Sequence, residues 1–142
     1  MKNNKVVMIM LILILAIAII GTGGFIYLSK FAGDQKEKEP SIDEVIESSV
    51  DIPEITTNLA SDSFIRISFK IQTDSKKAKE ELEKRDFQVQ NIIIQELSEK
   101  TEQDLKGKKG QLDLENDLKD KINELMQNGE IVQVYITNSL LQ

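Results

Sequence analysis

VVMIMLILILAIAIIGTGGFIYL, residues Val6–Leu28, is a run without a charge, a proline or a side-chain amide. Because hydrocarbon offers the backbone no water, such a run satisfies its own N–H and C=O groups as an α-helix. At about 1.5 Å per residue the helix would span roughly 34 Å, enough to cross a hydrocarbon core of about 30 Å. The sequence therefore predicts a transmembrane anchor, with the rest of the chain forming a small domain held at a membrane surface.

The charges on either side of this stretch indicate which way it crosses. Residues 1–5, MKNNK, are basic, whereas Lys36 and Lys38 on the other side stand among acidic residues. The count of lysines near the two ends does not decide the orientation. A short basic segment before an apolar stretch, however, is the layout of a secretory signal and keeps the N-terminus in the cytoplasm. We therefore predict a single-pass protein of the cell membrane with a cytoplasmic tail (1–5) and an extracytoplasmic C-terminal domain.

A cleaved signal peptide is the alternative to an anchor. Ala16–Ala18 reads AIA, which has the small-residue pattern of a cleavage site. Signal peptides normally have a shorter apolar region and a more polar approach to the cut. We therefore interpret Val6–Leu28 as an uncleaved anchor that contacts membrane lipid.

The composition argues against several classes of function. The chain has no cysteine and no histidine, which removes thiol catalysis, histidine-based triads, ordinary zinc sites and disulfides. Residues 31–142 carry 15 basic and 24 acidic residues, a net charge of −9. Such an acidic domain is a poor candidate for nucleic acid, whose affinity depends on neutralising phosphates. We expect the partners to be proteins.

A linker and a short helix come after the anchor. Residues 29–40 are polar and rich in charge, which is typical of a linker. Ser41 and Glu44 have the spacing of a capping box, which predicts a helix that ends at about Ser48. The apolar residues on one face of that helix are Ile42, Val45 and Ile46.

Two strands are predicted next, paired as a hairpin about a turn at Ala60–Ser63. Val50–Leu59 contains Pro53, which lacks a ladder donor and so favours a position at the sheet edge. Phe64–Gln72 alternates strictly, which indicates a half-buried antiparallel strand. The side chains expected to face the core are Ile65, Ile67, Phe69 and Ile71.

The charged stretch that follows is predicted to be helical. A capping Asp74 or Ser75 precedes the stretch KKAKEELEKRD, in which Glu81 and Arg85 stand four residues apart. We interpret this stretch as a solvated helix face. The spacing of the apolar residues in Phe87–Leu97 favours a helix. The triplet Ile92–Ile94 leaves a strand as the alternative.

The last third contains a hinge, a long helix and a strand. Thr101–Lys109 is the hinge, and the amphipathic helix is expected over Gln111–Gln127, ended by Gly129. Ile131–Thr137 is predicted to be the last strand, with NSLLQ as a tail. The order helix, strand, strand, helices, strand predicts an α+β domain over residues 41–142. The apolar residues of the long helix are Leu114, Leu118, Ile122 and Leu125.

No constellation of residues indicates chemistry. The acidic residues of Asp113–Asp117 lack the central glycine and the distal glutamate of a calcium loop. Gly107 and Gly110 match no phosphate-binding loop, and the acidic pair Glu80 and Glu81 is expected on an exposed face. We therefore predict no catalytic residue, no metal site, no cofactor and no enzymatic activity.

The segments, taken in order, resemble the family of flagellar basal-body-associated proteins FliL. After the basic N-terminus, the membrane helix and the charged linker come VDIPEITTNL, RISFKIQ, KRDFQVQNIIIQELS, TEQDLKGKKGQLDLENDLKDKINELM and VYITNSLLQ. The family often ends in a T-D-F-x-x-Q-like segment. Here Thr137–Gln142 reads TNSLLQ, with Asn138 and Ser139 where an acid and an aromatic residue are usual.

The resemblance implies a stomatin-like (SPFH-type) domain that self-associates into a ring. It further implies a non-enzymatic component of the flagellar motor that associates with stator proteins of the MotA/MotB type and with the basal-body ring, and that supports torque, swarming and chemotactic motility. Two alternatives stay open: a membrane-anchored adaptor or chaperone of a secretion or sporulation complex, and an anchored hydrolase that uses Asp and Ser. The strand edges are candidate assembly surfaces, and so are four residues that would be core in a monomer: Leu114, Leu118, Ile122 and Leu125.

Overall fold

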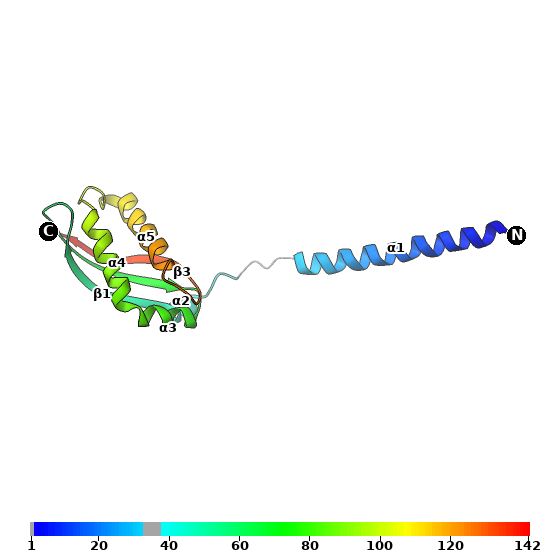
Figure 1. Ribbon diagram of the computed structural model, residues 1–142, viewed down its shortest axis with the longest axis horizontal. Coiled ribbons are helices and arrows are strands. Elements are labelled where there is room, and N and C mark those ends of the chain that lie inside the picture. The colour runs from blue at the N-terminus through cyan, green and yellow to red at the C-terminus, as the bar shows by residue number, and fades with distance from the viewer. Residues whose placement is uncertain (1, 33–37) are drawn as a thin grey trace. The chain divides into compact units, whose positions relative to one another are not determined.

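The computed structural model describes residues 2–32 and 38–142, and the chain divides into two compact units, 1–39 and 40–142 (Figure 1). The first unit holds one helix, α1 (Lys2–Ala32). Within it, Asn4–Tyr27 is long and apolar enough to cross a membrane. The helix continues past the predicted end at Leu28, so residues 29–32 of the expected linker are helical. Residues 33–37 of that linker lie outside the described residues.

The second unit is an α+β domain, as predicted. Its sheet is antiparallel with the order β1-β2-β3, so that β2 is central and β1 and β3 form the edges. Helices α4 and α5 lie side by side across one face of the sheet, α4 over β1 and α5 over β3 (Figure 1). The elements in chain order are α2 (Ile42–Glu47), β1 (Ser49–Asn58), β2 (Phe64–Thr73), α3 (Lys76–Lys84), α4 (Asp86–Glu99), α5 (Gly107–Asn123) and β3 (Ile131–Leu141).

The core lies between the helices and the sheet. The alternation of β2 correctly predicts its inward face, because all four expected side chains are buried: Ile65, Ile67, Phe69 and Ile71. The helices contribute the opposing layer, which consists of Leu82, Val89, Ile93, Leu97, Leu114, Leu118 and Ile122. On the other face of the sheet, here called the open face, Arg66 of β2 is exposed and Ser68 and Lys70 are half-buried.

The start of the domain follows local sequence rules. The Ser41 hydroxyl accepts a hydrogen bond from the Glu44 backbone N–H at 3.3 Å, and the Glu44 carboxylate accepts one from the Ser41 N–H at 2.7 Å, which confirms the capping box. Ile42 and Ile46 nevertheless stay exposed, because α2 is only six residues long and buries no side chain. β1 lies at the sheet edge as predicted, and its register shifts between Ile52 and Ile55, around Pro53.

The predicted bounds of the long helix were wrong at both ends. α5 begins at Gly107 rather than Gln111, because Gly107 adopts a positive φ of 72° that turns the chain into the helix. The helix ends at Asn123 rather than Gln127. There the Asn123 side chain accepts a hydrogen bond from the Ile131 N–H at 2.7 Å and donates one to the Ile131 C=O at 3.2 Å, which fixes the start of β3.

The last strand is longer than predicted. β3 runs to Leu141, so most of the NSLLQ tail belongs to the sheet and pairs with β2. Val132 was expected to share a face with Val134, but it is exposed while Ile131 is buried. The cause is a register shift opposite Gln72, which moves one side chain to the other face.

The apolar segment before the hinge is helical, so the strand alternative for Ile92–Ile94 is wrong. α4 buries Val89, Ile93 and Leu97, whereas Phe87 is 72% exposed. The face that α4 presents to the sheet therefore differs from the one that Phe87, Ile94 and Leu97 would define.

Candidate protein-interaction surfaces

The apolar stripe of α5 lies inside the domain. Leu114, Leu118 and Ile122 are at most 1% exposed and pack in the core, while Leu125 is half-buried beyond the end of the helix. In this fold the three buried side chains reach a partner only if α5 leaves the sheet. The structure places these three side chains in the core of the single chain. A role for them in assembly stays a prediction.

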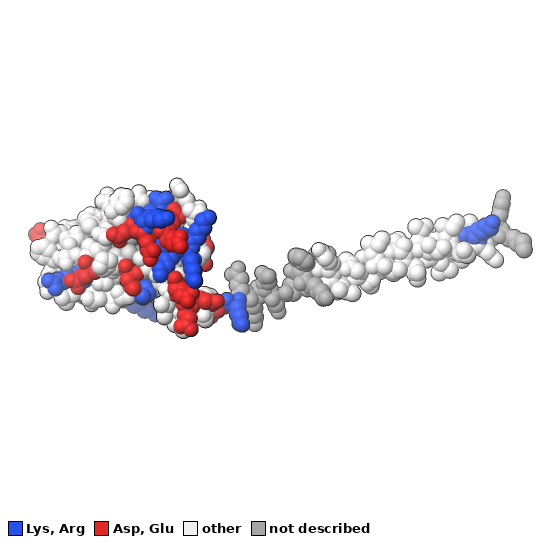
Figure 2. All heavy atoms as spheres, turned by 90° about the horizontal axis from the view of Figure 1, so that it is seen from below, with Lys and Arg blue, Asp and Glu red and all other residues white. Residues whose placement is uncertain are grey.

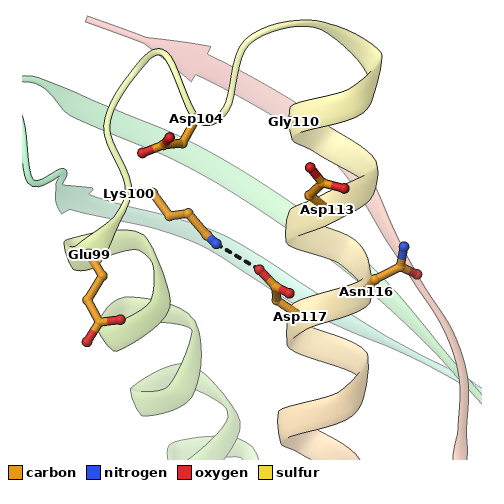
Figure 3. Close-up of a pocket in the computed structure, with 7 residues that line it drawn as sticks. All are labelled: Glu99, Lys100, Asp104, Gly110, Asp113, Asn116 and Asp117. Carbon is orange, nitrogen blue, oxygen red and sulfur yellow. Dashed lines mark hydrogen bonds and ion pairs between the residues drawn. The ribbon is translucent and has the colours of Figure 1, made fainter.

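Lysine and carboxylate side chains join α4 to α5. Glu96 is only 5% exposed and forms ion pairs with Lys121 and, at 3.2 Å, with Lys100. Lys100 also pairs with Asp117 on α5 at 2.7 Å, so one ammonium group links both helices (Figure 3). The buried carboxylate is thus paired with two cations, which offsets the cost of removing it from water.

The electrostatics of this cluster suit a structural link. The hydrogen bond to Asp117 raises the pKa of Lys100 against the opposing effect of burial, and Glu96 adds to the increase. The hydrogen bond to Glu96 likewise raises the pKa of Lys121. Both ammonium groups therefore stay charged. Glu99, Asp104, Asp113 and Asn116 line the same hollow (Figure 3). Among the described residues no group of three or more carboxylates is placed to hold a metal ion.

Glu81 holds the loop after α5 against α3, and this corrects the prediction of a solvated face for that residue. Its carboxylate accepts hydrogen bonds from the backbone N–H groups of Gln127 at 3.0 Å and Asn128 at 2.7 Å. Arg85 Nε donates a further bond at 2.8 Å. Burial raises the pKa of Glu81, but the bonds from Arg85, Asn128 and Gln127 outweigh it and lower the pKa to about 2.

One face of the domain carries charges of both signs (Figure 2). Figure 2 shows acidic and basic side chains intermingled over one face of the domain, without an extended patch of either sign. On the open face of the sheet Lys70 of β2 pairs with Asp51 of β1 at 2.7 Å. A face of mixed sign differs from the basic patch that is typical of nucleic-acid binding.

The two edges of the sheet differ in how they are protected. The β1 edge contains Pro53 between Asp51 and Glu54, and proline, charge and a bulge are all features that discourage strand pairing. The β3 edge also has register shifts, opposite Ser68/Phe69 and Gln72/Thr73, but it has none of these charges, since Ile131–Gln142 contains no acidic or basic residue. The edges are therefore unequal as interaction surfaces.

Glu96, which is buried, and Glu81, which is half-buried, were not predicted to face inward, although a helical period points to both. Glu96 stands three residues after Ile93 and seven after Val89, which places it on the buried face of α4. Glu81 stands three residues after the buried Ala78 in α3. Charged residues are mostly solvent-exposed in proteins, so the residue type alone points to the wrong side of the helix.

Two comparisons with known proteins bear on what this domain is. The family model described as "Flagellar basal body-associated protein FliL" matches residues 49–142, which is the domain from the start of β1 onward. The chain belongs to the FliL family. The "Flagellar protein FliL" of Bacillus subtilis (strain 168) is 50% identical over 109 residues, covering 77% of this chain and 78% of that protein.

FliL membership confirms the resemblance drawn from the order of the segments and identifies a protein family associated with the flagellar basal body. Such a family acts as a structural or accessory part of the flagellum. The apolar helix over Asn4–Tyr27 fits a membrane-anchored member.

Proposed function

We propose that this FliL-family protein is a non-enzymatic, membrane-anchored component of the bacterial flagellar motor. In this role it associates with the stator units and the basal body and supports rotation, torque and swarming. The observation that carries the proposal is the family match over the whole sheet and its helices, from Ser49 to Gln142. The relative from Bacillus subtilis extends the likeness to most of the chain.

We propose that the domain acts through its position, by holding neighbouring motor proteins in place and not by a chemical reaction. The N-terminus lies in the cytoplasm, α1 crosses the membrane, and the domain stands outside at the level of the stator. From Ala32 to Pro40 the chain can extend by about 30 Å at most, which limits the domain to a shell close to the membrane. The ion pairs of Glu96 and the hydrogen bonds of Glu81 stiffen the domain, as a spacer between larger assemblies requires.

Self-association into a ring and a stomatin-like (SPFH-type) fold complete the proposal. The architecture is compatible with both, because helices cover one face of the sheet and, among the described residues, no fourth strand pairs with its edges. The stator proteins, of the MotA/MotB type, and neighbouring copies are the partners that we expect.

Gene deletion followed by complementation tests the proposal. The deletion strain should swim and swarm poorly, and the full chain should restore both. A chain in which residues 1–28 are replaced by an unrelated single-pass helix of the same orientation should also restore motility, because α1 is expected only to tether the domain. An exported domain that begins at residue 29 should fold but fail to restore motility.

Two results would contradict the motor role. Full restoration by the untethered domain would show that anchoring is dispensable. Normal swimming and swarming in the deletion strain, together with a defect in secretion or sporulation, would favour an adaptor of another cell-envelope complex. A stator tagged with a fluorescent protein provides an independent readout, because its residence time at the motor should fall when the domain is absent.

A further inference from the structure

One exposed stripe of α4 carries no charge. Its side chains stand four, three and four residues apart, a spacing that places them on the same side of the helix. Phe87 is 72% exposed and Ile94 is 41% exposed. On α3, by contrast, every exposed side chain is charged. An exposed aromatic residue among uncharged neighbours is typical of the centre of a protein interface. We call this stripe the α4 flank, and it consists of Phe87, Asn91, Ile94 and Ser98.

The α4 flank points away from α5. Ile94 and Ser98 stand two residues before and after Glu96, so each lies roughly 160° from it, at about 100° per residue around the helix. Glu96 faces α5, because it forms an ion pair with Lys121. Since α4 lies over β1 and α5 lies over β3, the α4 flank faces outward on the β1 side of the domain.

α5 has a corresponding flank on the opposite side of the domain. Asp117 and Lys121 of α5 pair with α4, and Lys119 stands two residues from each of them. Lys119 therefore lies roughly 160° around α5 from both and points away from α4. The Glu115 carboxylate, one turn before Lys119, accepts a hydrogen bond from β3. We call this side the α5 flank, and it consists of Leu112, Glu115 and Lys119.

The two flanks carry complementary charges at the same height along the helices. The ion pairs Glu96–Lys121 and Lys100–Asp117 show that α4 and α5 are antiparallel and place Glu99 at the height of Lys119. Lys100 reaches toward α5, whereas Glu99 does not (Figure 3). Among the described residues, neither Glu99 nor Lys119 forms an ion pair. An acid on one side of the domain thus matches a base on the other.

We propose that the α4 flank of one copy packs against the α5 flank of the next, so that the helix layer continues from copy to copy. In this contact Glu99 pairs with Lys119 of the neighbour, and Phe87 covers the loop after α5, where Leu125 and Met126 are half-buried. The contact joins two different surfaces, and such heterologous contacts repeat around a ring when the rotation closes. The inference rests on the self-association proposed above, but not on the motor role.

A second copy fits the α4 flank for two further reasons. The β1 edge lies on the same side of the domain, and its Pro53 and acidic residues discourage strand pairing. A neighbour on this side therefore docks through the helix layer, and the α5 flank supplies a helix with the matching charge. The anchor also inserts every copy in one orientation, as a heterologous ring requires, and keeps copies at a high effective concentration.

Paired cysteines in this cysteine-free chain test the contact. The full-length chain with Ser98→Cys and Asn116→Cys is treated in its own membranes with a short bis-maleimide cross-linker. Asn116 is exposed, points away from α4 and lies one turn from Lys119, so the proposed ion pair stays intact (Figure 3). Each copy then links to two neighbours, and we expect a ladder of dimers, trimers and larger products. Either cysteine alone should leave the monomer, and the two single variants expressed together should stop at the dimer. The control pair is Ser98→Cys with Arg66→Cys, because Arg66 lies on the open face of the central strand.

Charge reversal tests the pairing of the two flanks. Added to the cysteine pair, Lys119→Glu should weaken the ladder, because it faces Glu99 of the neighbour, and Glu99→Lys in the same chain should restore it. No ladder, a dimer from either single cysteine, an equal ladder from the control pair or a ladder that charge reversal leaves unchanged would each overturn the proposal. Wild-type chain treated with an amine-reactive cross-linker separates two failures. Multimers there without the cysteine ladder would refute these surfaces alone, and no multimers would also refute self-association, whatever the motility of the strain.

Discussion

Replacing Leu118 by alanine measures whether the α5 stripe stabilises the domain or holds copies together. Leu118 is 0% exposed within the core cluster. Truncating a buried leucine to alanine typically costs about 2–5 kcal/mol, through lost burial and the cavity left behind. A domain of about 100 residues has a free energy of unfolding of only roughly 5–15 kcal/mol. Since each kcal/mol shifts Tm by about 4–8 °C at this size, we expect Tm to fall by at least about 8 °C.

Urea denaturation of residues 40–142, followed by circular dichroism, provides the free energy of unfolding. Leu112→Ala is the matched control, because Leu112 lies on the same helix and is 43% exposed. Exposed substitutions of this kind usually change stability by no more than about 0.5 kcal/mol. If Leu118→Ala kept the wild-type midpoint but lost self-association, the core role would be refuted and the predicted assembly role restored.

Three further substitutions test the core, a carboxylate and a glycine. Ile67→Asp should unfold the domain, since Ile67 is 1% exposed and a buried carboxylate there has no partner; a wild-type melting curve would contradict the orientation of β2. Glu81 has its folded pKa lowered from 4.5 to about 2, so its stabilising effect is present above pH 4.5 and is lost as the pH falls toward 2. The urea midpoint of Glu81→Gln should therefore lie below wild type at neutral pH and approach it in acid, whereas a constant gap would oppose the reasoning. Gly110→Ala should lower Tm, because the added Cβ would lie 2.4 Å from the Asp104 carbonyl oxygen and 2.7 Å from the Leu105 carbonyl carbon; the exposed Gln111→Ala should not, and an unchanged Tm for Gly110→Ala would mean that this backbone yields freely.

The parts of the fold that the sequence predicts well are those with a strong local period. The segment Ile65–Ile71 of β2 alternates because one face packs on helices and the other points away from them, so its inward residues could be assigned individually. The capping box before α2 is likewise complete within four residues. Both signals depend only on neighbours in the chain.

The parts that the sequence does not predict depend on distant neighbours. Gly110 resembles a helix breaker, yet it lies inside α5. A glycine is needed there because the backbone of Asp104 and Leu105 comes too close for a side chain. The NSLLQ tail contains turn-forming residues, but Phe64–Ser68 pairs with it and keeps it extended. The environment of Glu81 depends on Gln127 and Asn128, which lie 46 and 47 residues further along the chain, after α5, and donate hydrogen bonds to its carboxylate.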